Sequence, residues 1–171
     1  GDRLVEAIRR EEPDLILIGG DMLVGKEGHS FQNALELVGQ LPAIAPVFYA
    51  HGNHEQRVFH NTKRFGNTYL EYKEPLEDKG VQFLVDEKFL WNADDTSIEI
   101  VGIELPAEIY YRRADFKLDV SNITNRVGQA SQLFTILLAH HPEAAQTYWK
   151  WGADLVLAGH LHGGLVRIPF I

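Results

Sequence analysis

No cysteine occurs in the sequence, which excludes disulfide bonds, thiol nucleophiles, iron–sulfur clusters and cysteine-ligated zinc. Basic residues are few: 16 Lys and Arg stand against 24 Asp and Glu, a formal net charge of −8. Because an acidic surface repels a phosphate backbone, we expect no nucleic-acid-binding surface. No apolar run approaches the roughly 20 residues of a membrane-spanning helix, so we expect no such span within this chain.

The composition is that of a folded globular domain. Of 171 residues, 45% are hydrophobic and 23% are charged, which is typical of a chain that buries a core. The length fits one domain, and we assign residues 1–171 to it. The chain begins at Gly1 without a Met and ends at Ile171 within an apolar run. We therefore expect an incomplete domain, cut at both ends, from a longer protein.

Helical patterns alternate with short apolar runs along the chain. Helical spacing and end signals predict helices over residues 2–11, 30–41, 67–78 and 142–151. Apolar runs predict strands over residues 14–18, 46–50, 81–85, 97–102, 134–139, 154–158 and 165–168. Residues 81–85 and 97–102 are expected to flank a turn at 92–95, and residues 105–132 to form a long surface connection with one short helix. Near-continuous apolar strands are buried on both faces, so the pattern predicts a layered α/β fold.

Polar residues follow four of the predicted strands. Six of the eight histidines lie in three of these strand-end turns. Because ligands of α/β sheets bind outside the carboxyl ends of the strands, we expect these residues to share one rim. In chain order, the strands are followed by Gly20-Asp21, by His51-Gly52-Asn53-His54-Glu55, by His140-His141, and by Gly159-His160-Leu161-His162-Gly163-Gly164.

The side chains at this rim are metal-ligand types. Imidazole, carboxylate and amide oxygen together suit Mn²⁺, Fe or Zn²⁺. A bridged pair of divalent ions would use such a set, in which Asp21 is the one carboxylate among several neutral groups. The two ions of such a pair lie about 3.5–4 Å apart. Gly20, Gly52 and Gly159 each precede a polar residue. A residue without Cβ lets the chain turn sharply and lets a ligand approach the backbone there.

In order and in strand context, these motifs between residues 19 and 164 resemble the calcineurin-like metallophosphoesterase family. The resemblance implies a β-sandwich core of layered sheets flanked by helices. It also implies that Asp21 bridges two metal ions, that His162 binds the first, and that the second is completed by Asn53, His140 and His160. His54 would lie near the scissile phosphate as the catalytic proton donor or as a stabiliser of charge. Glu55 would orient the loop.

One element of the family pattern is missing. The family opens with an Asp-x-His pair that supplies two ligands to the first metal, and no such pair precedes Asp21 here. We expect the longer protein to hold two divalent ions (Mn, Fe or Zn). In this chain we expect the second site to bind better than the first, with one ion or none retained, so that the chain by itself could be inactive.

The function implied by the resemblance is metal-dependent hydrolysis of a small phosphorylated substrate, a phosphomonoester or phosphodiester, by a metal-bridging hydroxide. The alternatives are a catalytically inactive scaffold and a single-metal-binding domain built from Asp21, Asn53, His140 and His160. Residues 159–164 are similar to those of small bacterial phosphodiesterases that are often membrane-linked. Membrane association would then use a segment outside this chain. The sequence assigns neither the substrate nor the native metal, oligomeric state or cellular location.

The remaining polar residues have simpler interpretations. We interpret His51 and His141 as supporting or surface residues, and His29 and His60 as solvated loop histidines. In the connection over residues 105–132, Tyr110 with Arg112 and Arg113 is interpreted as part of a solvated charged cluster, with contact to a phosphate as the alternative.

Overall fold

The computed structural model describes residues 1–93, 95–110 and 117–162. Its strands are β1 (Ile16–Ile18), β2 (Val47–Ala50), β3 (Val81–Leu84), β4 (Glu87–Ala93), β5 (Thr96–Gly102), β6 (Phe134–Leu138) and β7 (Leu155–Leu157). Its helices are α1 (Asp2–Arg10), α2 (Gln32–Val38), α3 (Asn53–His60), α4 (Thr62–Phe65), α5 (Thr68–Glu77), α6 (Ala107–Tyr110), α7 (Val120–Val127) and α8 (Ala145–Trp151), with short 3₁₀ turns η1 (Leu41–Ala43) and η2 (Pro142–Ala144).

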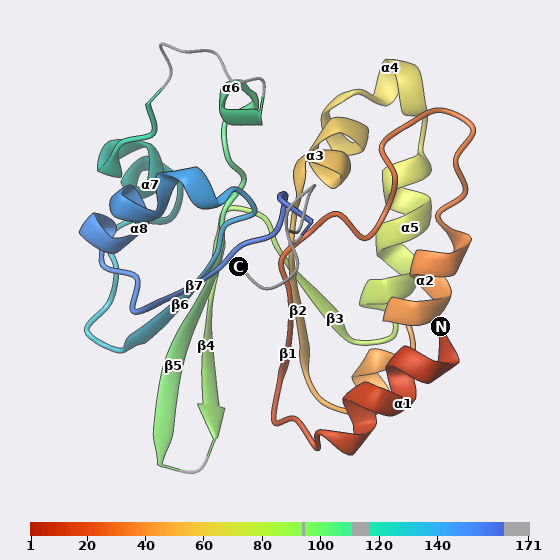
Figure 1. The fold of residues 1–171 in the computed structure, drawn as a ribbon, viewed down its shortest axis with the longest axis horizontal. Coiled ribbons are helices and arrows are strands. Elements are labelled where there is room, and N and C mark those ends of the chain that lie inside the picture. The colour runs from red at the N-terminus through yellow and green to blue at the C-terminus, as the bar shows by residue number, and fades with distance from the viewer. Residues whose placement is uncertain (94, 111–116, 163–171) are drawn as a thin grey trace, which may run out of the picture.

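Two sheets lie face to face between two layers of helices. The first sheet has the order β1-β2-β3 and is parallel throughout. The second has the order β4-β5-β6-β7, with β4 antiparallel to β5 and the other pairs parallel. Helices α1, α2 and α5 cover the outside of the first sheet, and α7 and α8 cover the outside of the second (Figure 1). The predicted layered α/β fold, with two sheets flanked by helices, is confirmed.

Alternation along the strands divides the core into three layers. In β2, Phe48 and Ala50 pack toward the second sheet, against Ile136 and Leu138 of β6. Val47 and Tyr49 of β2 belong to the cluster that packs under α2 and α5. Leu137 of β6 and Ala139 just after it belong to the cluster that packs under α7 and α8. Both faces of a central strand are thus buried, which is why β2 and β6 are almost wholly apolar.

Residues 81–85 and 97–102 form strands as predicted, but these two strands do not flank one turn. Residues Val81–Leu84 form β3, which pairs in parallel with β2 in the first sheet. The antiparallel partner of β5 is β4, which the sequence analysis missed. Asn92 and Ala93 of the predicted turn belong to β4, and residue 94 lies outside the described residues. Strand β4 is an edge strand of its sheet. Its apolar residues include Leu90, which is 52% exposed, so its pattern is not that of a buried strand.

The connection over residues 105–132 contains more structure than predicted. Its described part holds two helices, α6 and α7. Ile123 of α7 is buried and packs in the cluster on the outer face of the second sheet, so this segment is not only a surface connection. Helices α3 and α4 were also missed, because α3 turns a mainly polar face outward and buries only Glu55 and Val58. The predicted strand over 165–168 lies outside the described residues.

No described helix reaches the length and apolar character needed to cross a membrane.

Helix α7 depends on its N-cap. The Asp119 side chain accepts hydrogen bonds from the backbone N–H groups of Ser121 and Asn122, two of the first N–H groups of the helix. We expect Asp119→Ala to lower the melting temperature of the chain by roughly 2–4 °C. Asp119→Asn is the matched control, because Asn caps as well as Asp. Equal melting temperatures for Asp119→Ala and the wild type, measured by circular dichroism, would show that the cap contributes nothing.

Candidate metal centre

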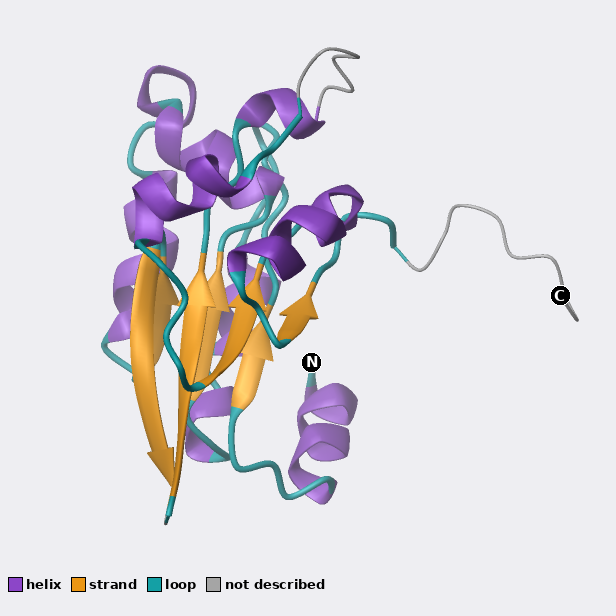
Figure 2. Ribbon diagram, turned by 90° about the vertical axis from the view of Figure 1, so that its left-hand side faces the viewer, coloured by secondary structure: helices purple, strands orange, loops and turns teal. Residues whose placement is uncertain are grey.

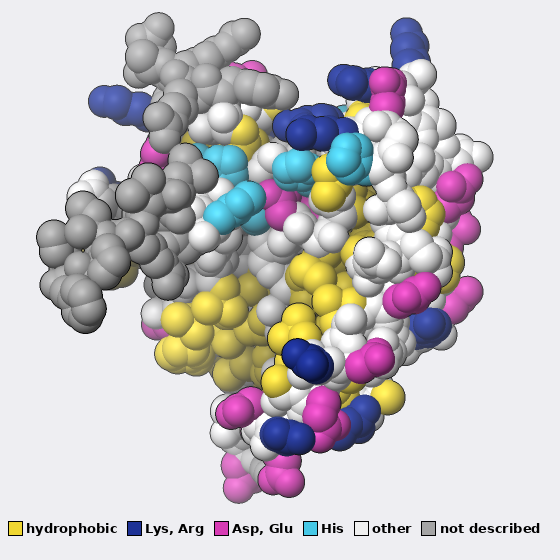
Figure 3. Space-filling model, turned by 45° about the vertical axis from the view of Figure 1, so that its right-hand side comes forward, with side chains coloured by type: hydrophobic (Ala, Val, Ile, Leu, Met, Phe, Trp, Pro, Cys, Tyr) yellow, Lys and Arg dark blue, Asp and Glu magenta, His cyan; other side chains and the backbone are white. Residues whose placement is uncertain are grey.

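The carboxyl ends of the parallel strands in both sheets point to the same end of the molecule (Figure 2). The turns that follow β1, β2, β6 and β7 carry the predicted ligands to this end. Figure 3 shows histidine side chains gathered around an acidic side chain in a hollow of this surface, above an apolar area. The shared rim predicted from the sequence is therefore present.

Four of the five predicted metal ligands lie together at this rim. Asp21, His140 and His160 each offer a ligand atom, and these atoms lie within 4.8 Å of one another. Asn53 belongs to the same group, since its Oδ1 is 3.0 Å from Nδ1 of His160. The fifth, His162, is exposed and lies outside this cluster of described ligand atoms.

The backbone is strained at the candidate ligands. Asp21, His160 and His162 have φ values of 59°, 63° and 50°, in the left-handed region that costs a residue with a side chain about 1–2 kcal/mol. Such strain concentrates at functional sites, where the surrounding structure holds it in place. At these three positions it coincides with residues that the sequence analysis assigned to metal binding.

The three glycines of the strand-end motifs permit close approaches that any side chain would block. A Cβ on Gly20 would lie 2.1 Å from the backbone nitrogen of Gly52, and a Cβ on Gly52 would lie 2.3 Å from Oδ1 of Asp21. A Cβ on Gly159 would lie 2.9 Å from Cε1 of His140. The missing side chains therefore let the end of β1 meet the end of β2, and the end of β6 meet the end of β7.

Glu55 holds the loop after β1 against the start of α3. Its side chain is fully buried. Its two carboxylate oxygens accept hydrogen bonds of 2.6–3.3 Å from four backbone N–H groups and one hydroxyl, those of Asp21, Met22, Leu23, Gly52 and Tyr49. Burial and the Glu55 carboxylate raise the pKa of Tyr49 well above its ordinary value, so the hydroxyl retains the proton that it donates. The expected loop-orienting role of Glu55 agrees with these contacts.

Hydrogen bonds fix the orientation of His140. Its Nδ1 lies 2.6 Å from the carbonyl oxygen of Gly19 and can only donate to it. Its Nε2 therefore faces Asp21, 2.9 Å from Oδ2. A backbone carbonyl on one nitrogen leaves the other as the ligand, which is the usual arrangement of a metal-binding histidine.

The charges in the cluster suit a cation. Burial raises the pKa of Asp21, but the hydrogen bonds from His140 and from the backbone N–H of His54 outweigh it, so the pKa lies below its ordinary value. Burial lowers the pKa of His140, and the Asp21 carboxylate reverses this and raises it. Burial, with His141 and His140 nearby, lowers the pKa of His160. The carboxylate of Asp21 and a neutral imidazole at His160 are thus available together near neutral pH. The donor set of carboxylate, imidazole and amide fits a borderline divalent ion.

His54, predicted as the catalytic residue, is held at the same rim. Its backbone N–H donates to Oδ1 of Asp21 over 2.9 Å. Its ring Nδ1 accepts a 2.7 Å hydrogen bond from the backbone N–H of Gly25. The accepting Nδ1 leaves Nε2 as the nitrogen that carries the proton in the neutral ring.

A second set of polar residues lies near the rim, and its central residue, Glu104, was not anticipated. Glu104 is buried and bridges two histidines, with Oε1 2.6 Å from Nδ1 of His51 and Oε2 2.7 Å from Nε2 of His60. His60 is exposed to solvent, as predicted, but it ends α3 rather than lying in a loop, and it pairs with a buried carboxylate. Its position after a strand could have identified Glu104, because this residue follows β5 in the same way as Asp21 follows β1.

Tyr110 is the other residue whose interpretation changes. Its ring centroid lies 5.3 Å from that of His160 and 5.6 Å from that of His141. Tyr110 therefore packs against the metal cluster and does not belong to a solvated charged group. Arg112 and Arg113, which were interpreted with it, lie outside the described residues.

Comparison with known proteins agrees with the site. A family model described as calcineurin-like phosphoesterase matches residues 2–164. The chain is 26% identical to phosphodiesterase YaeI of Escherichia coli, over 94% of this chain and 53% of that protein. It is 27% identical to the uncharacterized metallophosphoesterase YkuE of Bacillus subtilis, over 98% of this chain and 53% of that protein. An uncharacterized metallophosphoesterase of Helicobacter pylori strain J99 is 31% identical, over 98% of this chain and 40% of that protein. The chain thus spans about half the length, or less, of these curated relatives.

Proposed function

The chain belongs to the calcineurin-like phosphoesterase family, a family that implies divalent metal ions, and on that premise we propose that it hydrolyses a small phosphomonoester or phosphodiester with a pair of such ions. The observation that carries the proposal is the convergence of Asp21, His140 and His160, whose ligand atoms lie within 4.8 Å of one another. These residues come from the ends of three strands in two sheets, and their chemistry is that of a metal site.

Each residue of the rim has a separate task in this proposal. Asp21 supplies the negative charge of the cluster, and His140 supplies an imidazole whose orientation Gly19 fixes. When bound, the divalent ions supply an activated water and neutralise charge on the phosphoryl oxygens. His54 carries its proton on Nε2, because Nδ1 accepts from Gly25, and we expect it to protonate the departing oxygen or stabilise its charge.

Metal dependence tests the proposal. We expect the full-length protein to hydrolyse bis(p-nitrophenyl) phosphate or p-nitrophenyl phosphate, to lose this activity after treatment with a chelator, and to regain it with added Mn²⁺ or Zn²⁺. The same protein unfolded by heat is the control for hydrolysis by the free ions. A rate that chelation leaves unchanged would contradict metal-dependent hydrolysis, and the absence of hydrolysis of either ester with every ion would favour a scaffold.

A single-metal site is the second candidate. The observation that favours it is the position of His162, the predicted ligand of the first metal, outside the cluster formed by the other described ligands. Elemental analysis of the full-length protein separates the two. Two ions per chain support the dinuclear site, and one ion per chain supports a mononuclear site at Asp21, Asn53, His140 and His160.

A further inference from the structure

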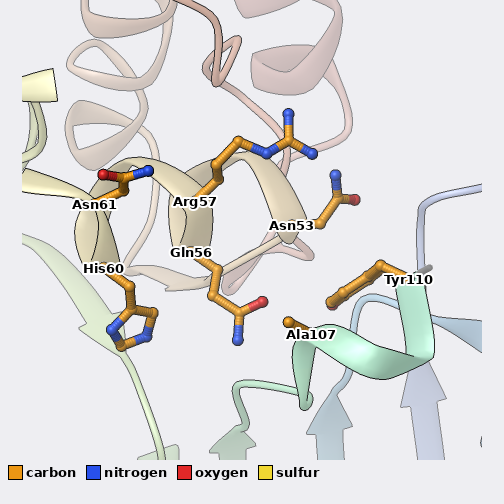
Figure 4. Close-up of a pocket in the computed structure, with 7 residues that line it drawn as sticks. All are labelled: Asn53, Gln56, Arg57, His60, Asn61, Ala107 and Tyr110. Atoms are coloured by element: carbon orange, nitrogen blue, oxygen red, sulfur yellow. The ribbon is translucent and has the colours of Figure 1, made fainter. Parts of the chain in front are cut away.

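A cavity of about 390 Å³ adjoins the metal cluster. It lies between α3 and α6 (Figure 4) and is lined by Asn53, Gln56, Arg57, His60, Asn61, Ala107 and Tyr110. Two of these residues also contact the cluster. Asn53 lies 3.0 Å from Nδ1 of His160, and the ring of Tyr110 is 5.3 Å from the ring of His160. The volume is within the range of small-molecule sites, so a substrate with its phosphate at the cluster could extend into this cavity.

The polar side chains of α3 that line the cavity are held in place by bonds to other elements. The amide of Gln56 donates to the carbonyl of Leu105 over 2.6 Å. His60 pairs through Nε2 with the buried carboxylate of Glu104. Side chains that are already oriented lose little freedom when a ligand binds, which is typical of a recognition surface.

The charge of the cavity is opposite to that of the whole chain. The formal net charge of the protein is −8, yet Arg57 lines the cavity and no carboxylate is among its described lining residues. Glu104, which lies behind His60, is already paired with two histidines. An anionic group in the cavity would therefore face a guanidinium and amide groups rather than an unpaired carboxylate.

Arg57 retains most of its hydrogen-bonding capacity. A guanidinium has five N–H donors in a fork that matches a carboxylate or phosphate. The described structure gives Arg57 one hydrogen bond, a 3.3 Å contact from Nη1 to the carbonyl oxygen of Gly25. That contact anchors the side chain at the edge of the cavity and leaves its other donors for a ligand.

We propose that the α3–α6 cavity binds the part of the substrate beyond the scissile phosphate, and that Arg57 selects esters that carry a second anionic group there. The inference rests on the proposed function, because it assigns the scissile phosphate to the neighbouring metal cluster. Tyr110 and Ala107 form the less polar wall opposite α3 and would contact the carbon skeleton between the two anionic groups (Figure 4).

Binding of two non-hydrolysable probes tests this assignment without a measurement of activity. The probes are butylphosphonate, which has one anionic end, and butylene diphosphonate, which has two. We expect calorimetric titration of the Mn²⁺-loaded full-length protein to give roughly ten- to hundredfold tighter binding of the diphosphonate, the range of one charge-assisted hydrogen-bonded pair. Arg57→Gln should reduce this preference to less than about threefold, while the monophosphonate binds as before.

Arg9→Gln is the matched control, because Arg9 is exposed on α1, away from the cavity. It should leave both affinities unchanged. Equal affinity of the wild type for the two probes, or a preference that survives Arg57→Gln, would overturn the assignment of Arg57 while leaving the proposed function intact. Failure of both probes to bind would overturn the assignment together with the phosphate site on which it depends.

Discussion

Asp21→Asn is expected to weaken Mn²⁺ binding by at least about a hundredfold. Loss of a residue that only hydrogen-bonds to a metal ligand typically lowers metal affinity 10–100-fold, and loss of a charged ligand itself should cost no less. Asp21 is the one carboxylate in the described ligand cluster. Its removal takes away the charge that attracts the cation and leaves two imidazoles and an amide. Isothermal titration of the chain with Mn²⁺ measures the change.

The substitution by Asn isolates the charge from the shape of the loop. Asn, like Asp, tolerates the left-handed φ of 59° at this position better than most other residues with a side chain do. Its Oδ1 can still accept the hydrogen bond from the backbone N–H of His54. The melting temperature should therefore stay close to that of the wild type while the affinity for Mn²⁺ falls.

Asp86→Asn is the matched control for this prediction. Asp86 has a similar φ of 55°, and its carboxylate accepts from the backbone of Glu104 and from Arg126 rather than facing the cluster. Mn²⁺ affinity should not change in this variant. An equal loss in both variants, or wild-type affinity in Asp21→Asn, would show that the cluster is not the metal site.

Glu55→Gln is expected to destabilise the fold by about 3 kcal/mol, because each buried donor left without an acceptor costs roughly 1–3 kcal/mol. One carboxylate oxygen of Glu55 accepts from two backbone N–H groups, and the other accepts from two more and from the Tyr49 hydroxyl. An amide nitrogen in either position would face two backbone N–H groups that it cannot accept from. The side chain is fully buried, so water cannot replace the lost acceptor.

Chemical denaturation of the variant measures this loss. The control is Glu71→Gln, the same chemical change at an exposed position of α5, for which we expect no more than about 0.5 kcal/mol. Because Glu55 binds the backbone of Asp21, Mn²⁺ affinity should also fall in Glu55→Gln under conditions where the chain remains folded. Stability equal to that of Glu71→Gln would mean that the five hydrogen bonds contribute nothing to the fold.

Strand-end residues were the part of the site that could be predicted from the sequence. Asp21, Asn53, His140 and His160 each follow an apolar run, and such runs are recognisable because both faces of the strand are buried. The carboxyl ends of parallel strands then share one edge, so sequence order was sufficient to expect the four residues together. The same reasoning identified Gly20, Gly52 and Gly159 as points of close approach.

Strand β4 and helix α3 could not be predicted. Strand β4 is at the edge of its sheet, and α3 buries only Glu55 and Val58, so neither has the dense apolar pattern of a buried element. The cavity beside α3 was missed for the same reason. Its walls come from α3 and α6, and no local pattern relates Arg57 to Tyr110.

The sequence by itself determined the family, the layered α/β architecture and the chemistry of the rim, because burial periodicity and strand-end residues are local properties of the chain. Only the tertiary structure decided which strands pair, that Glu104 bridges His51 and His60, and that Arg57 and Tyr110 line one cavity. These contacts join residues that are far apart in the chain, and their partners depend on how the two sheets and the helices pack. Local sequence contains no information on that packing, and so the metal cluster could be predicted while the neighbouring cavity could not.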